Sequence, residues 1–263
     1  QTCALPISPL KQNNPFFPFF FTFRGITMSA VEIAKTESPL EAKKKGEFSP
    51  YEDNGGSVVA YGGKDFCVVA ADTRMNLGYA IPSRELVKLF QLTSRCVLAA
   101  SGMAADVVAL VKRLQIDLTW YKHHHGKEMP TKALAQYLSN TLYSKRFFPY
   151  YAFCILAGID ENGHGCCFEY DAVGSYQLLP YGSSGSAKTL IQPFLDSQLN
   201  LQHQQIKTRP EGFDVPLDDA KALVREAITA GTERDIHTGD WLDLWVIHAN
   251  GTISKERFPL KFD

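Results

Sequence analysis

The chain has 263 residues, of which 45% are hydrophobic and 12% aromatic, so it can bury a substantial core, and this composition excludes an intrinsically disordered protein. Its formal net charge of -1 gives no general attraction to nucleic acids or to anionic membranes. We therefore expect protein or small-molecule partners, with no nucleic acid and no membrane among them.

The six cysteines lie mostly within apolar runs, and none forms a CxxC arrangement repeated with histidines. This pattern favours buried thiols in a reducing compartment over disulfides or a metal site. A redox switch at the adjacent Cys166 and Cys167 is the alternative, but neighbouring residues of a strand point to opposite faces and rarely bridge. The full set is Cys3, Cys67, Cys96, Cys154, Cys166 and Cys167.

Two segments at the start of the chain differ from the rest. The first, "QTCALPI", resembles the in-frame translation of a sequencing adapter, and "NPFFPFFFTFRG" lacks the basic start and the cleavage site of a signal peptide. We interpret residues 1–27 as untranslated or artefactual sequence and expect the natural start at Met28. Residues 28–48 are charged and lack apolar periodicity, which predicts a flexible leader or extension. One domain, residues 49–263, then remains.

Short apolar runs separated by glycines predict antiparallel strands in the first half of this domain. These runs are residues 57–63, 66–73, 86–92 and 95–102. Apolar residues at helical spacing predict a mostly buried helix after Gly102. A second helix is predicted over residues 131–145, because Pro130 and Thr131 supply typical starting residues.

The second half of the domain repeats strands and helices in blocks. Two or three strands are expected within residues 150–185, followed by a helix. Residues 217–235 are amphipathic with acids at the amino end, which is typical of a helix. Residues 241–249 and 252–260 predict a hairpin, because Asn-Gly joins them. This order indicates an α+β fold whose sheets are covered by helices.

Four features have both a chemical and a structural interpretation. His123 to His125 end a helix, where positive charge is favourable; metal binding is the alternative. Residues 181–189 are glycine- and serine-rich but lack the GK[ST] order of a phosphate loop, which favours a tight turn. Asp235 and Thr238 form a helix cap or turn; alternatively, the Asp235 carboxylate orients a neighbouring group. Lys88 is either an ordinary exposed residue of an alternating strand or a residue that takes part in the chemistry of a site. We predict no metal and no cofactor.

Taken together, the runs "GGSVVAYGGKDFCVVAADTR", "AASGMAADV", "GSSGS" and "TERDIHTGD", with Lys88 sixteen residues after Asp72, resemble the signature series of proteasome beta subunits. The resemblance covers about residues 48–263 and is specific, because the motifs are long and in order. It implies the N-terminal nucleophile hydrolase fold, a four-layer αββα sandwich of two antiparallel sheets flanked by helices. That fold agrees with the predicted order of elements.

The resemblance also implies a site. In active members of the family, a threonine freed by self-cleavage after a glycine uses its hydroxyl as nucleophile and its own amino group as base. A lysine and an aspartate tune and orient this group, a backbone amide forms the oxyanion hole, and three later residues support it. These positions fall, in that order of roles, on Lys88, Asp72, Gly102, Ser184, Asp235 and Thr238.

The threonine position, sixteen residues before Asp72, is occupied by Gly56, which has no hydroxyl. Ser57 follows one residue later, and strand alternation points it to the opposite face from Lys88. We therefore predict a vestigial site without a catalytic residue, in which Lys88 is a structural ion-pair partner of Asp72. The alternative is an active peptidase that cleaves between Gly56 and Ser57 and uses Ser57 at a free amino terminus, with a β-bulge correcting the register.

The function implied by the resemblance is that of a non-catalytic structural beta subunit, forming the wall of the proteolytic chamber of the 20S proteasome core in ubiquitin-dependent protein degradation. Its expected partners are the other beta and alpha subunits of a 28-subunit alpha-beta-beta-alpha assembly. The expected location is the cytoplasm and the nucleus. A self-compartmentalised peptidase of the bacterial kind is disfavoured, because such rings need a nucleophile in every copy.

Overall fold

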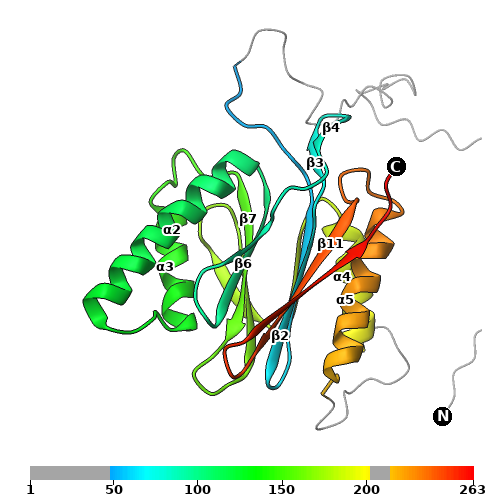
Figure 1. The fold of residues 1–263 in the computed structure, drawn as a ribbon. Helices are drawn as coiled ribbons and strands as arrows, with labels where there is room; N and C mark the ends of the chain where they lie inside the picture. Colours follow the sequence, from blue (N-terminus) through cyan, green and yellow to red (C-terminus); the bar gives the residue numbers. More distant parts are fainter. Residues whose placement is uncertain (1–47, 202–213) are drawn as a thin grey trace, which may run out of the picture. The chain divides into compact units, whose positions relative to one another are not determined.

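Two five-stranded antiparallel sheets face each other in the computed structural model, which describes residues 48–201 and 214–263 (Figure 1). The first sheet, in the order β10-β1-β2-β11-β12, consists of β1 (Ser57–Gly62), β2 (Phe66–Asp72), β10 (Tyr181–Gly185), β11 (Trp241–His248) and β12 (Ile253–Pro259). The second, in the order β5-β6-β7-β8-β9, consists of β5 (Leu89–Gln91), β6 (Cys96–Gly102), β7 (Ala152–Ile159), β8 (Gly165–Tyr170) and β9 (Tyr176–Leu179).

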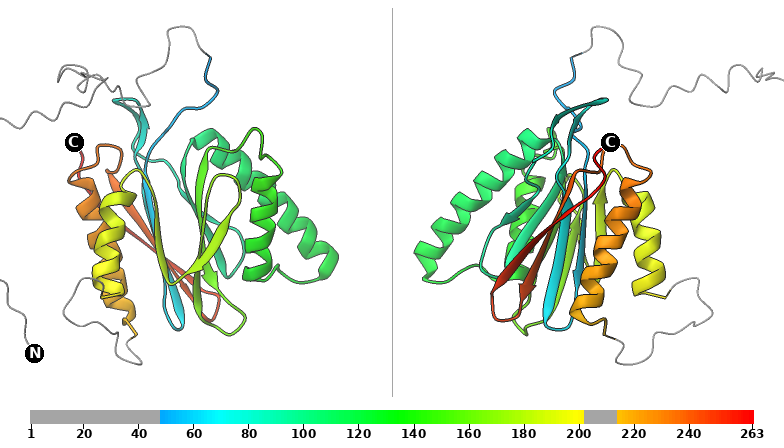
Figure 2. Two further views of the ribbon diagram at one scale, coloured as in Figure 1. Left: turned by 180° about the vertical axis from the view of Figure 1, so that it is seen from behind. Right: turned by 45° about the vertical axis from the view of Figure 1, so that its right-hand side comes forward.

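Helices cover the outer face of each sheet (Figures 1 and 2). The second sheet packs against α2 (Ala104–His125) and α3 (Thr131–Tyr143), and the first packs against α4 (Lys188–Leu199) and α5 (Leu217–Thr232). The predicted α+β sandwich of four layers, αββα, is confirmed. Among the described residues, no helix combines the length and the apolar character needed to cross a bilayer.

The alternation of side chains along β1 divides them between two hydrophobic cores. Val59 and Tyr61 face α4 and α5, in a cluster that we call the helix-side core. Val58 and Ala60 face the second sheet, in a cluster that we call the inter-sheet core. Full burial of an aliphatic side chain such as these valines stabilises a protein by about 1.5–3 kcal/mol. The position of any residue at the start of β1 is therefore set by its place in this alternation.

The structure differs from the predicted elements in three places. Residues 150–185 contain four strands, β7 to β10, where two or three were expected, because the glycine- and serine-rich run at 181–185 is itself a strand. A two-stranded hairpin of β3 (Met75–Leu77) and β4 (Ala80–Ser83) follows β2, where no strand was predicted. Lys88 precedes β5 instead of lying within a strand, and it is buried rather than exposed. The predicted hairpin of β11 and β12 is confirmed. The expectations for residues 1–47 lie outside the described residues.

Candidate functional site

Asp72 and Lys88 form a buried ion pair at the end of β2. Lys88 Nζ donates a hydrogen bond of 2.7 Å to Asp72 Oδ1 and another of 2.7 Å to the carbonyl of Arg74. The Asp72 carboxylate also accepts hydrogen bonds from the backbone amides of Ser57, Arg74 and Gly239. The ion pair predicted from the sequence is therefore present, and each of its charges has several partners.

Burial raises the pKa of the Asp72 carboxyl and lowers the pKa of the Lys88 ammonium, because each charge has been removed from water. The attraction between the two groups, 2.7 Å apart, opposes this effect on both. A lysine with a lowered pKa can assist a nearby nucleophile. Here the residue beside the ammonium is Gly56, directly before β1, which offers no hydroxyl.

Gly56 also has no room for a side chain. Its φ of +90° is a conformation that residues with a Cβ rarely adopt. A Cβ at this position would lie 2.0 Å from Lys88 Nζ and 3.0 Å from Asp72 Oδ1. The Lys88 ammonium therefore occupies the volume that a nucleophilic side chain at residue 56 would need.

The Ser57 hydroxyl points away from Lys88, toward the helix-side core. Ser57 Oγ lies 2.8 Å from Thr238 Oγ1 and accepts a hydrogen bond of 3.0 Å from the amide of Ala187. The residue is 0% exposed, and its own amide nitrogen donates to Asp72 at 2.8 Å. The pairing of β1 with β2 shows no shift in register, so no β-bulge redirects the side chain. These contacts agree with the orientation predicted from strand alternation.

We expect the substitution Ser57→Ala to destabilise the protein without changing peptide hydrolysis by the complex that contains it. The variant leaves the buried amide of Ala187 without its acceptor, so the free energy of unfolding should fall by about 1–3 kcal/mol. Denaturant unfolding and a peptide-hydrolysis assay measure the two effects. Ser144→Ala, at the exposed end of α3, is the control and should change stability by less than about 0.5 kcal/mol. A hydrolysis rate that falls with Ser57→Ala would contradict this expectation.

A second cluster of hydroxyls surrounds Asp235. Thr238 Oγ1 donates to Asp235 Oδ2 at 2.7 Å, as expected for a carboxylate that orients a neighbour. Ser186 Oγ also donates to Asp235 Oδ2, at 2.5 Å, and the Ser186 amide donates to the carbonyl of Gly56. The sequence assigned the supporting serine to Ser184, whereas the structure brings Ser186 to this position. Because "GSSGS" contains three serines, only the resemblance could indicate which of them supports the site.

Arg74 fixes the turn that carries Asp235 and Thr238. Its guanidinium is buried and donates to both carboxylate oxygens of Asp240 and to the carbonyl of Ile236. Bidentate contact between an arginine and a carboxylate is strong and directional. This pair could not be predicted from the sequence, because its two members are 166 residues apart.

Asn54 was also missed, although it holds the chain upstream of Ser57 in place. Its amide donates to the carbonyl of Gly102, and its carbonyl accepts from the amide of Asn76, each at 3.1 Å. Its side chain accepts from the amide of Ala104 at 2.8 Å and donates to the carbonyl of Asn76 at 2.9 Å. The backbone at Asn54 is thus paired like a short strand between two segments. Nothing in the sequence around Asn54 marked this role, because its partners lie 22 to 50 residues away.

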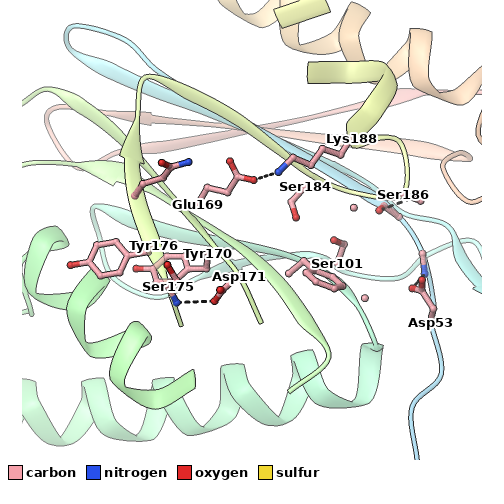
Figure 3. Close-up of a pocket in the computed structure, with 16 residues that line it drawn as sticks. Asp53, Ser101, Glu169, Tyr170, Asp171, Ser175, Tyr176, Ser184, Ser186 and Lys188 are labelled. Atoms are coloured by element: carbon pink, nitrogen blue, oxygen red, sulfur yellow. Dashed lines mark hydrogen bonds and ion pairs between the residues drawn. The ribbon is translucent and has the colours of Figure 1, made fainter. Parts of the chain in front are cut away.

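A pocket of about 680 Å³ opens beside these groups, between the two sheets (Figure 3). Gly56, Gly102 and Ser184 line it, so the structure brings these three predicted positions together. Asp72 and Lys88 are buried and are not among its lining residues, and the Ser57 hydroxyl lies on the other face of β1. The arrangement leaves a recess with backbone and hydroxyl groups and, among its described lining residues, no activated nucleophile.

The remaining features singled out in the sequence lie away from this pocket. The three histidines end α2 next to Gly126, where Trp120 stacks on His124 with ring centroids 5.2 Å apart. The five cysteines among the described residues are buried and free. Burial raises the pKa of Cys96 to about 11 and that of Cys154 to about 12, which keeps both thiols protonated and unreactive near neutral pH.

Comparison with known proteins agrees with the resemblance seen in the motifs. Residues 52–247 match the family described as "Proteasome subunit". The chain is 47% identical over 239 residues to "Proteasome subunit beta type-1" of Dictyostelium discoideum, covering 90% of this chain and 99% of that protein. It is 49% identical over 223 residues to the protein of the same name in Arabidopsis thaliana, covering 84% and 99%. The corresponding protein of Danio rerio is 41% identical over 227 residues, covering 86% and 92%. The chain therefore belongs to the proteasome subunit family.

Proposed function

We propose that this chain is a non-catalytic, structural beta subunit of the proteasome core particle and forms part of the wall of its proteolytic chamber. The observation that carries the proposal is the Lys88 ammonium in the place that a side chain at residue 56 would need. Loss of a hydroxyl alone is reversible by one substitution. Loss of the space as well requires the buried end of the Lys88 side chain to leave its hydrogen bonds with Asp72 and Arg74.

The other positions of the site are then vestigial and serve stability. Asp72 and Lys88 join the end of β2 to the start of β5, and Asp235 with Thr238 joins the last turn to β1 through Ser57. Gly102 and Ser184 remain on the pocket wall without a nucleophile to serve. The contacts of Asp72, Lys88, Asp235 and Thr238 serve the fold whether or not the chain is catalytic.

The contacts of Asn54 support an uncut chain at Ser57. In active members a free amino group acts as the base, and cleavage directly before the nucleophile creates it. Residues upstream of Ser57 are instead hydrogen-bonded to Gly102 and Asn76, and Tyr51 donates to the carbonyl of Pro149 at 2.7 Å. We infer that these residues stay in the mature chain as part of its fold.

Members of this family assemble with other proteasome subunits. The match with this chain covers nearly the whole length of the two relatives named "Proteasome subunit beta type-1" in Dictyostelium discoideum and Arabidopsis thaliana. By that likeness we place the chain among the other beta and alpha subunits of a 28-subunit alpha-beta-beta-alpha assembly. We place the assembly in the cytoplasm and the nucleus, in ubiquitin-dependent protein degradation.

The rival function is a peptidase with Ser57 as nucleophile. It requires the Ser57 hydroxyl to reach a peptide in the pocket, but this hydroxyl is buried and held by Thr238 and Ala187 on the other side of β1. Cleavage would free the amine without turning the side chain. The geometry therefore favours the structural role.

A covalent probe tests the proposal directly. An electrophilic peptide that reacts with amino-terminal threonine or serine nucleophiles is applied to the assembled complex, and the labelled chains are identified by mass spectrometry. We expect this chain to stay unlabelled while catalytic subunits of the same complex react, which makes them the internal control. A covalent adduct on Ser57 would establish the rival function.

A further inference from the structure

The chain contains three Asn-Gly pairs, at residues 54–55, 162–163 and 250–251. All three lie in turns or loops of the described structure. In such a pair the backbone nitrogen of the glycine can attack the side-chain carbonyl carbon of the asparagine, because glycine has no Cβ to obstruct the approach. Each pair is therefore a candidate for deamidation, and its surroundings decide whether it reacts.

At the turn between β11 and β12, two donors hold the side-chain oxygen of Asn250. Asn250 Oδ1 accepts a hydrogen bond of 2.9 Å from the backbone amide of Thr252 and one of 2.6 Å from the Thr252 hydroxyl. The bond from the amide closes a ring that includes Gly251, so it folds the Asn250 side chain alongside the backbone nitrogen that would attack it. Asn250 and Thr252 are both exposed. This pair is thus arranged for attack and open to water.

The two donors also stabilise the reaction itself. When the Gly251 nitrogen attacks, negative charge develops on Asn250 Oδ1, the atom that the Thr252 amide and hydroxyl already contact. Donors aimed at an oxygen that gains charge lower the barrier, as in an oxyanion hole. At a site exposed to water, one ordinary hydrogen bond corresponds to about two- to tenfold in rate.

Asn162 lacks this arrangement, although it is equally exposed. Its backbone amide donates to Asp160 Oδ1 at 2.8 Å, and its side-chain amide donates to Asp160 Oδ2 at 3.3 Å. The side chain is therefore tied to Asp160, two residues back in the chain, rather than folded over Gly163. The Asp160 carboxylate would also oppose the negative charge of the intermediate. We expect this pair to react more slowly.

Asn54 is protected by its contacts. The residue is 5% exposed, its side-chain nitrogen donates to the carbonyl of Asn76 at 2.9 Å, and its side-chain oxygen accepts from the amide of Ala104 at 2.8 Å. Both ends of the side-chain amide are thus held by other segments, and ammonia has no free path out. The glycine amide donates a hydrogen bond in all three pairs, so that contact does not distinguish them.

We propose that Asn250 is the site at which this chain deamidates, with Thr252 promoting the reaction. The Gly251 nitrogen forms a bond to Asn250 Cγ, the bond from Cγ to Nδ2 breaks, and the proton of the Gly251 amide leaves with Nδ2 as ammonia. Water then opens the succinimide to aspartate or isoaspartate. Either product places a carboxylate at the hairpin, and isoaspartate also adds a backbone carbon between β11 and β12. The proposal does not depend on whether the chain is catalytic.

The test incubates the assembled complex at mildly alkaline pH, which favours loss of the glycine amide proton, and follows the three asparagines by peptide mass mapping. An endoprotease that cleaves before aspartate but not before isoaspartate separates the two products. We expect Asn250 to convert at least about fivefold faster than Asn162, and Asn54 to stay unconverted. The same measurement in denaturant is the control, because without the fold the three pairs should convert at similar rates.

Two variants test the role of Thr252. Thr252→Val removes the hydroxyl but keeps the backbone amide and the branched shape, and it should slow conversion of Asn250 about two- to tenfold. Thr252→Ser keeps the hydroxyl and should convert at about the unsubstituted rate. Equal rates at Asn250 and Asn162 in the folded complex would overturn the proposal. So would an Asn250 that stays unconverted, or a Thr252→Val variant that converts as fast as the unsubstituted chain or faster. Labelling of a nucleophile is a separate measurement, so the two proposals fail independently.

Discussion

Replacing Lys88 by methionine is expected to lower the free energy of unfolding by about 3–5 kcal/mol, the usual cost of leaving one charge of a buried pair without its partner. Methionine fills a similar volume, so the effect reports the lost charge rather than a cavity. Asp72 would remain buried, with three amide donors but no cation. Denaturant unfolding of the full chain, followed by tryptophan fluorescence, measures the change.

Two controls make this result specific. Lys122→Met removes an exposed lysine 3.1 Å from Glu128, and an exposed pair contributes less than about 1 kcal/mol. The double variant Asp72→Asn/Lys88→Met removes both buried charges and should be less destabilised than Lys88→Met alone, since no unpaired charge remains. If Lys88→Met costs no more than Lys122→Met, the ion pair does not hold the site together.

Replacing Gly56 is expected to be nearly as damaging. In Gly56→Ala the new Cβ meets Lys88 Nζ, and the residue must also keep a φ of +90°. Strain and overpacking together should cost about 2–6 kcal/mol. Gly78→Ala is the matched control, because Gly78 has a φ of +59° with nothing within 4 Å of the new Cβ. It should cost only the backbone strain, about 1–2 kcal/mol.

The same clash predicts the fate of a restored nucleophile. Gly56→Thr places a hydroxyl at the family's catalytic position, yet we expect no peptide hydrolysis from this chain. The lysine occupies the required space, and the chain must also be cut before residue 56 to free an amine. Peptide mass mapping shows whether the chain is cut before residue 56. A peptide-hydrolysis assay, with the catalytic subunits of the complex blocked, measures the activity of this chain. Hydrolysis by the variant, with a new amino terminus at the substituted residue, would show that the site is only one substitution from activity.

The sequence predicted the order of the helices and of most strands, and the orientation of residues on β1. Period-two alternation placed Ser57 on the face opposite Lys88, and the contacts of Ser57 with Thr238 and Ala187 lie on that opposite face. Apolar alternation is local, so it can be followed along a single strand. The same holds for the hairpin of β11 and β12, where an Asn-Gly turn joins two apolar strands.

Features that depend on distant partners were harder to predict. The residues around Lys88 could not decide whether its side chain is exposed or buried, because burial of this lysine depends on its contact with the distant Asp72. Asn54 and Ser186 gained their roles from segments 22 to 130 residues away, with nothing in their own neighbourhood to mark them. A resemblance gives positions by spacing, and it cannot decide which serine of a run faces a carboxylate.

The amino terminus of the mature chain tests the central claim most directly. The chain is purified from its assembled complex and its first residue is identified by peptide mass mapping. We predict a start upstream, near Glu47 or Phe48, with an intact peptide that spans the bond between Gly56 and Ser57. A chain that begins at Ser57 would carry a free amine next to Asp72 and would contradict the structural role proposed here.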